Sequence, residues 1–281
     1  MWTAYEADGN FKICAFYSAF VRMCRHEYFF PGEAHDFWEI IYCIKGSACV
    51  SADDRVLNLT ENQIIFHKPM EFHSFRVMPD TPSDLFIMSF KTEGEFMKAF
   101  EGKVFFLNPD HKRSLMDIVA FLKSGGERQK GEFLPTAYLD KMSCIPYALN
   151  TLRNITENFL ISLSQSNAAP TQLVKTMETS IYAAALRIID ESVSERITVE
   201  QLSRRCNVSS AYLKKIFDKY NGLGIHEYIL KNKISIAKQM LLSGEPVTEI
   251  ADNLGFSNQH YFSTAFKRET GITPSQYRKN G

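Results

Sequence analysis

The sequence predicts an α+β protein with two domains: an N-terminal antiparallel β-barrel followed by connector helices, and a C-terminal all-α domain with two helix-turn-helix units. Three observations lead to this prediction. Strand-like runs fill residues 10–107, helical periodicity begins after Asn108-Pro109, and residues 199–271 contain an internal repeat. A chain of 281 residues also suits two domains better than one.

The first region is rich in β-strand signals. Short runs of Ile, Val, Phe and Tyr alternate with turn signals, which are Lys45-Gly46, Ala52-Asp53-Asp54, Glu61-Asn62 and Lys68-Pro69. Residues 83–90, with the sequence SDLFIMSF, predict one more strand. Strands at spacings of roughly 8–12 residues are typical of an antiparallel sandwich or barrel.

Two amphipathic helices are predicted next. Apolar residues recur at helical spacing in two sets, Leu115, Ile118, Val119 and Leu122, then Leu149, Leu152, Ile155, Phe159 and Leu163. The segment SQSNAAPTQ (164–172) is small, polar and contains proline, which is typical of a linker. We therefore place the domain boundaries at 1–107, 108–171 and 172–281, with the middle segment as a helical connector.

Composition and charge narrow the function. The chain is 45% hydrophobic and 23% charged, as in globular proteins, and its formal net charge is zero. Residues 172–281 carry 15 Lys and Arg against 11 Asp and Glu, whereas residues 1–171 carry 17 against 21. This asymmetry favours a nucleic-acid-binding C-terminal end. The cysteines lack C-x-x-C spacing, and neither a secretion signal nor a membrane span is present, so we expect a cytoplasmic protein with no membrane partner.

The C-terminal repeat is the most informative pattern. Residues 199–222 align with residues 247–271 at an offset of 48, which becomes 49 after one inserted residue. Each copy has a small residue for close helix packing, a residue that tolerates a left-handed turn, a hydrophobic plug and a serine to cap the second helix. These residues are Ser203, Asn207, Val208 and Ser209 in the first copy, and Ala251, Gly255, Phe256 and Ser257 in the second.

Polar side chains at the start of each second helix suit DNA. A recognition helix contacts the major groove with its N-terminal side chains, where amides pair with adenine and Lys contacts guanine or phosphate. The predicted DNA-binding residues are Ser209, Ser210, Ala211, Lys214 and Lys215, then Ser257, Asn258, Gln259, His260, Thr264 and Lys267. Two ordinary helical hairpins with solvated polar faces are the alternative, which the matching copies disfavour.

The segment between the copies, 225–244, has helical periodicity. At about 1.5 Å per residue, roughly 18 residues of helix span about 27 Å. Two recognition helices held so far apart could enter successive major grooves on one face of the duplex, about 34 Å from one another.

The C-terminal hundred residues resemble the AraC/XylS family of bacterial transcription regulators. The stretch IADNLGFSNQHYFSTAFKRETGITPSQYR (250–278) carries the resemblance. It implies sequence-specific DNA binding through two helix-turn-helix units joined by a long helix. The chain departs from the family pattern at Ser203 and Asn207, where Ala and Gly are usual, and at Lys233, where Arg is common. The change at Lys233 implies a weaker backbone contact, because Lys cannot fork as Arg does.

The N-terminal half resembles the small β-barrel (cupin) sensor domain of many such regulators, on the segments EAHDFWEIIYCIKG and QIIFHKPMEFHSF. Alternate residues of a strand share a face, so we expect Glu33, His35, Phe37 and Glu39 to point into the barrel. The resemblance places His73 near the same mouth. Trp38, Ile40, Tyr42 and Ile44 should point the other way and pack under the connector helices.

Three interpretations of this cluster stay open. The preferred one is a pocket for a small polar effector such as a sugar, with an aromatic floor and a few polar groups. The second is a metal site of Glu33, His35, Glu39 and His73, although metal cupins usually present two His where this chain has Glu33 and His35. The third is a structural cluster in an empty barrel. We accordingly predict no metal and no other cofactor, and interpret His67 and His26 as ordinary core or surface residues.

These observations predict a transcription activator or other regulator that responds to an effector, and not an enzyme. The expected partners are double-stranded DNA, a small-molecule effector and a second copy of the chain, with RNA polymerase as a further candidate. The resemblance implies that the connector helices form the dimer interface. Two alternatives remain: a metal-dependent cupin enzyme with a DNA-binding tail, and a DNA-binding protein that needs no ligand.

Overall fold

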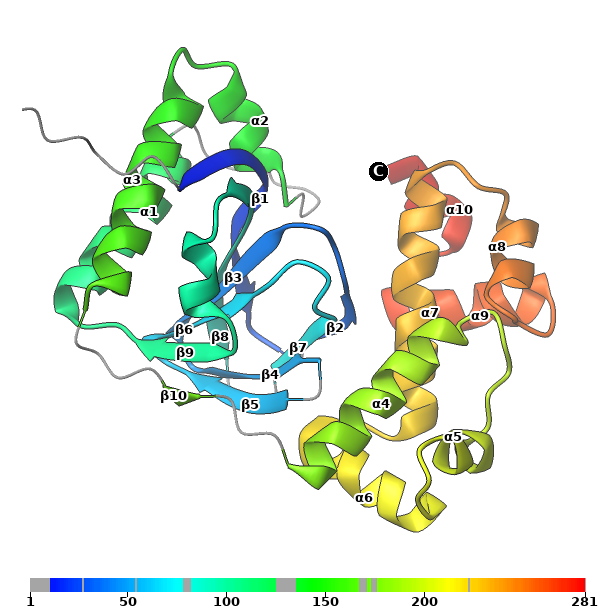
Figure 1. The fold of residues 1–281 in the computed structure, drawn as a ribbon. Helices are drawn as coiled ribbons and strands as arrows, with labels where there is room; N and C mark the ends of the chain where they lie inside the picture. The colour runs from blue at the N-terminus through cyan, green and yellow to red at the C-terminus, as the bar shows by residue number, and fades with distance from the viewer. Residues whose placement is uncertain are drawn as a thin grey trace, which may run out of the picture.

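The N-terminal half consists of two antiparallel sheets (Figure 1). The structure, a computed structural model, describes residues 11–26, 28–53, 55–77, 82–124, 135–166, 171–172, 176–221 and 223–280. Its strands are β1 Lys12–Cys24, β2 Tyr28–Glu33, β3 Trp38–Lys45, β4 Ser47–Ala52, β5 Arg55–Thr60, β6 Gln63–His67, β7 His73–Val77, β8 Ser83–Glu93, β9 Lys103–Phe106 and β10 Thr171–Gln172. One sheet has the order β1-β8-β3-β6-β9-β10 and the other β2-β7-β4-β5.

The two sheets pack face to face as a β-sandwich, so the predicted barrel is divided into two hydrogen-bonded sheets. Hydrophobic side chains of both sheets, among them Ile41, Cys43, Val50 and Val77, form a buried cluster between them. Strand β3 shows the predicted alternation, since Trp38, Ile40 and Tyr42 belong to a separate cluster on the opposite face of the sheet.

That opposite face is covered by helices α1 (Pro109–Ser124), α2 (Ala137–Ser143) and α3 (Ala148–Ser164). Leu115 and Ile118 of α1 and Leu152 and Phe159 of α3 are buried against Trp38 and its neighbours. The predicted packing under the connector helices is therefore confirmed. Helix α2 and the short 3-10 helix η1 (Phe96–Phe100) were not predicted, because each is too short to show a clear helical period.

The predicted linker 164–172 is shorter than expected. Ser164 still belongs to α3, residues 167–170 lie outside the described residues, and Thr171 and Gln172 pair with β9 opposite Val104 and Lys103. The chain therefore returns to the edge of the six-stranded sheet before it enters the helical half.

The C-terminal half contains α4 (Met177–Glu191), α5 (Val199–Arg205), α6 (Ser210–Asn221), α7 (Ile225–Leu242), α8 (Val247–Asn253), α9 (Gln259–Thr270) and α10 (Pro274–Asn280). Figure 1 shows α4, α5 and α6 around one end of α7, and α8, α9 and α10 around the other. Helix α7 contributes Ile225 and Tyr228 to the first hydrophobic cluster and Ile234, Ala237 and Leu241 to the second. One continuous helix thus forms part of both cores.

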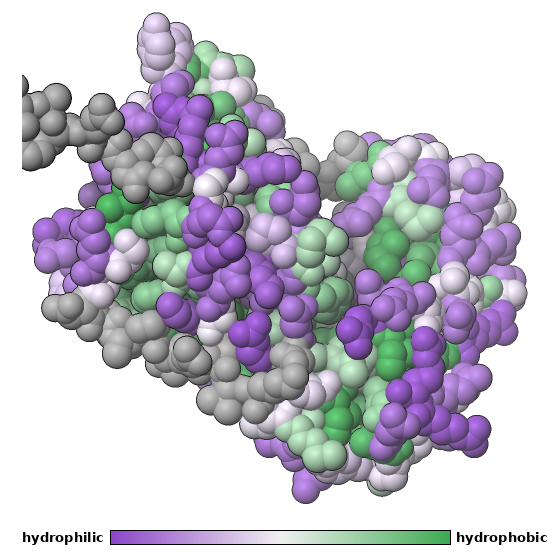
Figure 2. Space-filling model, in the orientation of Figure 1, coloured by the Kyte–Doolittle hydropathy of each residue, from purple (hydrophilic) through white to green (hydrophobic). Residues whose placement is uncertain are grey.

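The four-stranded sheet packs against the first of these helical units. Phe29, Val56 and Phe72 join the hydrophobic cluster of α4, α5 and α6, and the ring of Phe29 meets that of Tyr228 edge-on at 4.9 Å. The molecule therefore runs in layers: connector helices, six-stranded sheet, four-stranded sheet and helical half. In Figure 2, hydrophilic side chains cover much of the outer edge of the helical half, while hydrophobic ones lie along its middle, over α7.

Candidate DNA-binding surface and inter-sheet cavity

Two helix-turn-helix units are formed by α5 with α6 and by α8 with α9. Asn207 and Gly255 occupy their turns with φ of 55° and 63°, the left-handed conformation that the repeat predicted. A Cβ on Gly255 would lie 2.2 Å from the carbonyl oxygen of Ser194, so only glycine fits there. Ser203 and Ala251 are both buried, as close packing of the two helices in each unit requires.

The capping residue was predicted correctly in the first unit and wrongly in the second. Ser209 Oγ accepts a hydrogen bond from the backbone N–H of Tyr212 at 3.2 Å and caps α6. In the second unit the cap is Asn258, whose Oδ1 accepts from the N–H of Tyr261 at 2.8 Å, and Ser257 lies one residue before it. The extra residue of the second copy therefore falls before the cap and not after it.

Most of the predicted DNA-binding side chains are exposed on α6 and α9. The exposed ones are Ser209, Ala211, Lys214, Lys215, Ser257, Asn258, Gln259, His260, Thr264 and Lys267. Ser210 differs, because its hydroxyl is half-buried and lies 2.9 Å from that of Ser203. Ser210 thus joins α5 to α6 inside the unit, a contact that the repeat alone did not indicate.

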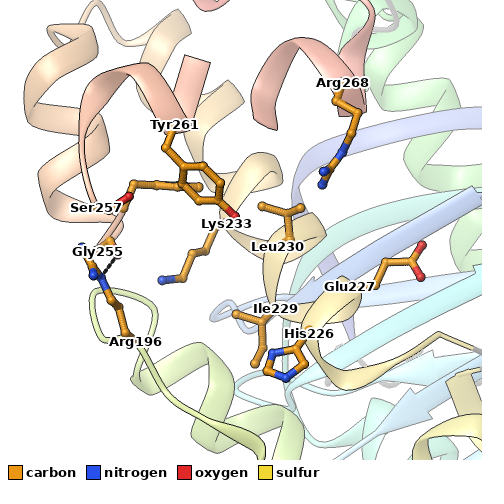
Figure 3. Close-up of a pocket in the computed structure, with 11 residues that line it drawn as sticks. Arg196, His226, Glu227, Ile229, Leu230, Lys233, Gly255, Ser257, Tyr261 and Arg268 are labelled. Atoms are coloured by element: carbon orange, nitrogen blue, oxygen red, sulfur yellow. Dashed lines mark hydrogen bonds between the residues drawn. The ribbon is translucent and has the colours of Figure 1, made fainter. Parts of the chain in front are cut away.

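A groove of about 470 Å³ lies between the two units (Figure 3). Its lining residues are Arg196, His226, Glu227, Ile229, Leu230, Lys233, Gly255, Phe256, Ser257, Tyr261 and Arg268. Figure 3 shows side chains of α7 along one wall and Ser257 and Tyr261, at the start of α9, on another. Arg196, Lys233 and Arg268 outnumber the one acidic lining residue, Glu227, so the groove has an excess of basic residues next to the exposed end of α9.

Lys233 at the base of this groove has a structural role. Its Nζ donates to the carbonyl oxygen of Glu195 at 2.9 Å, and its side chain is buried. Burial lowers the pKa of Lys233, with a further contribution from Arg196. Arg196 Nε donates to the carbonyl oxygen of Gly255 at 3.3 Å. The backbone contact of Lys233 is thus made within the protein, where it fixes the loop before α5 to α7.

A second cavity, of about 260 Å³, lies between the sheets at the open edge formed by β1 and β2. Its walls contain equal numbers of aromatic residues and of other polar or charged residues: Tyr17, Ser18, Phe20, Arg22, Tyr28, Phe30, Glu33, Phe37, Glu39, Phe75, Ile87, Ser89, Pro135 and Gln239. Gln239 belongs to α7, so the helical half supplies part of the wall. We call this space the inter-sheet cavity.

The β1 residues of the cavity were not among the predicted ligand-binding residues. Ser18, Phe20 and Arg22 alternate along the strand, and this signal could have identified them. Tyr17 also lines the cavity, because the β1–β8 register shifts between Phe16 and Ser18. That irregularity has no signal in the sequence.

The five predicted ligand-binding residues do come together, but not along one strand. Glu33 ends β2, His35 and Phe37 lie in the following loop, and Glu39 belongs to β3. The predicted alternation from Glu33 to Glu39 is therefore wrong. Glu33, Phe37 and Glu39 line the inter-sheet cavity, whereas His35 stacks on Phe37 at 3.7 Å and meets the ring of His73 at 4.9 Å.

These groups form a compact electrostatic cluster. His73 Nε2 lies 3.3 Å from Glu39 Oε1, and His35 Nε2 lies 3.9 Å from an oxygen of both Glu33 and Glu39. Burial alone would raise the pKa of Glu39, but its contacts with His73 and Ser89 outweigh burial and lower it. Burial alone would lower the pKa of His73, but the neighbouring Glu39 carboxylate outweighs burial and raises it.

His67 adds to this cluster, although the sequence predicts only an ordinary core or surface residue there. It is fully buried, its Nδ1 lies 2.9 Å from Glu71 Oε2, and its ring stacks on His73 at 4.4 Å. Burial, with His73 nearby, lowers the pKa of His67 well below its usual value. His26, by contrast, is exposed as expected.

Family models match both halves of the chain. A helix-turn-helix domain model matches residues 202–280, and a model of the AraC-like ligand binding domain matches residues 16–101.

Among the described residues, no helix combines the length and apolar character that crossing a bilayer requires.

Three named relatives also match, two over part of the chain and one over most of it. The regulatory protein PocR of Salmonella typhimurium is 32% identical over 116 residues, which are 41% of this chain and 38% of PocR. The bifunctional transcriptional activator/DNA repair enzyme AdaA of Bacillus subtilis is 34% identical over 92 residues, 32% of this chain and 44% of AdaA. The chain thus spans less than half the length of these two relatives. The Msm operon regulatory protein of Streptococcus mutans is 24% identical over 266 residues, 91% of this chain and 89% of that protein.

Solved structures include the C-terminal domain of AraT, a response regulator from Geobacillus stearothermophilus, with 34% identity and a TM-score of 0.34 over 36% of this chain and 84% of that one. Fatty-acid-bound ToxT from Vibrio cholerae has 15% identity and a TM-score of 0.38 over 99% and 98% of the two chains. Together the two family models cover most of the sandwich and of the helical half, so the chain combines an AraC-like ligand binding domain with a helix-turn-helix domain.

Proposed function

We propose that the protein is a sequence-specific DNA-binding transcription regulator that responds to a small molecule in the inter-sheet cavity. The observation that carries the proposal is the pair of exposed polar helices, α6 and α9, fixed to one continuous helix. The 18 residues of α7 span about 27 Å at roughly 1.5 Å per residue. This separation suits insertion into successive major grooves, about 34 Å apart, on one face of the duplex.

The exposed side chains divide by chemistry. Gln259 and His260, in the first turn of α9, carry groups that hydrogen-bond base edges, and we assign them to base contacts. Lys214, Lys215 and Lys267 are exposed cations, and we assign them to phosphates. Asn258 supplies Oδ1 to its own helix, so its main contribution is to position α9.

The inter-sheet cavity supports a small polar effector. Its aromatic residues supply contact area, and its charged and hydroxyl groups can fix the orientation of a ligand. Arg22 lines one wall, and the carboxylates of Glu33 and Glu39 line another part of the cavity. Groups of both charges suit a polar effector with several hydroxyl groups, such as a sugar or sugar derivative. Binding without turnover is sufficient for this role, so we propose no enzymatic activity.

Gln239 gives the effector a direct route to the DNA-binding units. It reaches the cavity from α7, the helix that belongs to both hydrophobic cores of the helical half. A ligand that contacts Gln239 binds one arrangement of α7 and the sandwich better than another. Such coupling between sites typically amounts to about 1–3 kcal/mol.

The remaining features of the proposal concern assembly. We propose a cytoplasmic homodimer formed through the connector segment 108–171, where Tyr147, Leu149 and Ile161 are exposed hydrophobic side chains. A dimer would present four helix-turn-helix units to paired half-sites. Activation would further involve RNA polymerase. The division into 1–107, 108–171 and 172–281 belongs to this proposal; one hydrophobic cluster joins the first two segments, and Phe29, Val56 and Phe72 pack against the third.

A selection experiment tests the function. The purified full chain selects binding sites from random duplexes, and fluorescence anisotropy then measures its affinity for the selected site with and without candidate sugars and sugar derivatives. His260→Ala should cost about 1–3 kcal/mol of specific binding and relax the preference at one position, whereas His26→Ala in the sandwich should change nothing. Gln239→Ala should keep the DNA affinity and lose the effector response. If no sequence is enriched, the protein is not a sequence-specific regulator.

A further inference from the structure

We infer that one end of the inter-sheet cavity is a binding site for a first-row divalent transition metal ion, held by Glu33, His35, Glu39 and His73. Each residue offers one ligand atom, and the four atoms lie within 4.8 Å of one another. The site deepens the proposed function, because its role in signalling rests on the regulator that the cavity serves. Metal binding itself can be measured without DNA.

The distances suit a metal ion after a small contraction. Ligand atoms about 2.0–2.2 Å from a zinc ion lie roughly 3.0–3.5 Å from one another. His73 Nε2 is 3.3 Å from Glu39 Oε1, and His35 Nε2 is 3.9 Å from Glu33 Oε1 and from Glu39 Oε2. Rotation of the Glu33 side chain, which is 44% exposed, can close its gap to His35, and a shift of about 0.4 Å brings His35 Nε2 and Glu39 Oε2 to 3.5 Å.

Backbone carbonyl groups orient both imidazole rings so that Nε2 faces the cluster. His35 Nδ1 lies 3.0 Å from the carbonyl oxygen of Phe37, and His73 Nδ1 lies 3.0 Å from that of Glu71. A carbonyl oxygen only accepts hydrogen bonds, so each Nδ1 carries the hydrogen. Once the ring is neutral, Nε2 presents its lone pair to the cluster, so a metal ion must displace the proton that Glu39 stabilises on His73. This orientation by a backbone carbonyl is usual for metal-bound histidines.

Buried polar atoms at the site lack other hydrogen-bond partners. His73 is 0% exposed, and its Nε2 makes no hydrogen bond among the described residues, despite its ion-pair distance to Glu39. His35 Nε2 is also buried and makes no hydrogen bond among the described residues. A buried nitrogen without a hydrogen bond costs free energy, and a metal ion between Glu39 and the two rings would satisfy both nitrogens.

A second layer of contacts orients the proposed ligands. Ser89 Oγ donates to Glu39 Oε2 at 2.7 Å, and Ser18 Oγ lies 2.7 Å from Ser89 Oγ. On the other side, the ring of His67 stacks on His73 and is itself bonded to Glu71. Outer contacts of this kind hold ligands in position and raise metal affinity. They also account for the buried His67, for which the DNA-binding function has no use.

The donor set selects the class of metal. Two imidazole nitrogens and two carboxylate oxygens suit Mn²⁺ to Zn²⁺, whereas Mg²⁺ and Ca²⁺ prefer oxygen ligands alone. Oxygens of Glu33 and Glu39 each lie 3.9 Å from His35 Nε2, so two carboxylates share this space. A divalent cation would offset the repulsion between them. Since Glu33 and Glu39 also line the inter-sheet cavity, the ion would form its end wall.

Calorimetric titration of the full chain, first stripped of metal with EDTA, tests the site. We expect one equivalent of Zn²⁺ or Co²⁺ to bind, Co²⁺ to show the visible absorption of a low-symmetry nitrogen and oxygen site, and Mg²⁺ not to compete. Combining His35→Ala with His73→Ala should abolish this binding. Ser89→Ala, which leaves all four ligands in place, should weaken it about 10–100-fold. His26→Ala removes an exposed histidine of the same half and should change nothing.

Circular dichroism and the fluorescence of buried Trp38 show whether each variant folds. The inference is overturned if the folded chain binds no stoichiometric Zn²⁺ or Co²⁺, or if the double variant binds them as tightly as the unchanged chain. Binding to the selected duplex is measured on the same samples. A chain that binds specific DNA but no metal refutes only the metal site, and a chain that binds metal but no specific DNA refutes only the regulator.

Discussion

Gly255 allows a quantitative test of the second helix-turn-helix unit. In Gly255→Ala, the left-handed φ of 63° costs an L-residue roughly 1–2 kcal/mol. The new Cβ would also lie 2.2 Å from the carbonyl oxygen of Ser194, where ordinary contact begins at 3.4 Å, so the loop before α5 must retreat by about 1.2 Å. That movement strains the hydrogen bonds of Arg196 to Gly255 and of Lys233 to Glu195, each worth about 0.5–1.5 kcal/mol.

Gly271→Ala is the matched control. Gly271 has φ of 81° and nothing within 4 Å of its added Cβ, so it bears only the conformational cost. We expect Gly255→Ala to lower the free energy of unfolding by about 2–5 kcal/mol and Gly271→Ala by about 1–2 kcal/mol.

Urea unfolding followed by circular dichroism measures the helices, while fluorescence of the two tryptophans, Trp2 and Trp38, reports on the N-terminal half. Equal losses in Gly255→Ala and Gly271→Ala would refute the close approach of Gly255 to Ser194. A loss in Gly255→Ala that appears equally in the fluorescence would contradict its localisation to the helical half.

Three further predictions follow from single contacts. Lys214→Ala should weaken binding evenly across DNA sequences and reduce the slope of log affinity against log salt by about one; an unchanged slope would remove Lys214 from the phosphate contacts. Asn258→Ala should cost about 0.5–2 kcal/mol of stability through the lost cap of α9, and Asn258→Ser should restore most of it in the same urea titration. Burial raises the pKa of Cys49 to about 11, and its Sγ lies 3.1 Å from the carbonyl oxygen of Tyr220 across the two halves. The Cys49 thiolate should therefore be about two orders of magnitude scarcer at pH 8 than that of an ordinary thiol, and labelling by a thiol reagent should accelerate as pH rises toward 11 or when the halves separate. Rapid labelling of the undisturbed protein at pH 8, with Cys14, Cys144 and partly exposed Cys206 replaced by Ser, would show that the halves are not packed as described.

Features that depend on neighbouring residues could be predicted from the sequence. Gly255 and Asn207 were identified because few residues accept a left-handed turn, and α7 because its apolar residues follow the helical period. The cap of α9 could not be fixed in the same way. Ser and Asn cap helices about equally well, so an inserted residue fits on either side of Ser257, and only the fold chooses Asn258.

The cluster around Glu39 was predicted for an incomplete reason. Every second residue from Glu33 to Glu39 carries a suitable side chain, which resembles strand alternation, but the chain leaves β2 after Glu33 and enters β3 only at Trp38. Gly32, with φ of 119°, lets this segment approach the carbonyl oxygen of His73, where a Cβ would lie 2.8 Å away. The convergence thus depends on the β2–β7 contact between distant parts of the sequence.

The cavity wall from Gln239 could not be predicted at all. It depends on how the helical half packs against β2, and this packing involves residues about 200 positions apart, for which local periodicity carries no information. The same holds for the contact between Cys49 and Tyr220.

The pairing of Thr171 and Gln172 with β9 keeps the two halves of the chain close together. Because Gln172 is held at the sheet edge and α4 is capped by Thr176, only four residue steps separate the sheet from the helical half. A chain covers at most about 3.3–3.6 Å per residue, so the tether can extend no more than roughly 15 Å. The effective concentration of each half at the surface of the other is therefore on the order of millimolar or higher. Even a weak interface stays closed at such a concentration, and an effector that opens it must overcome the tether as well as the contacts.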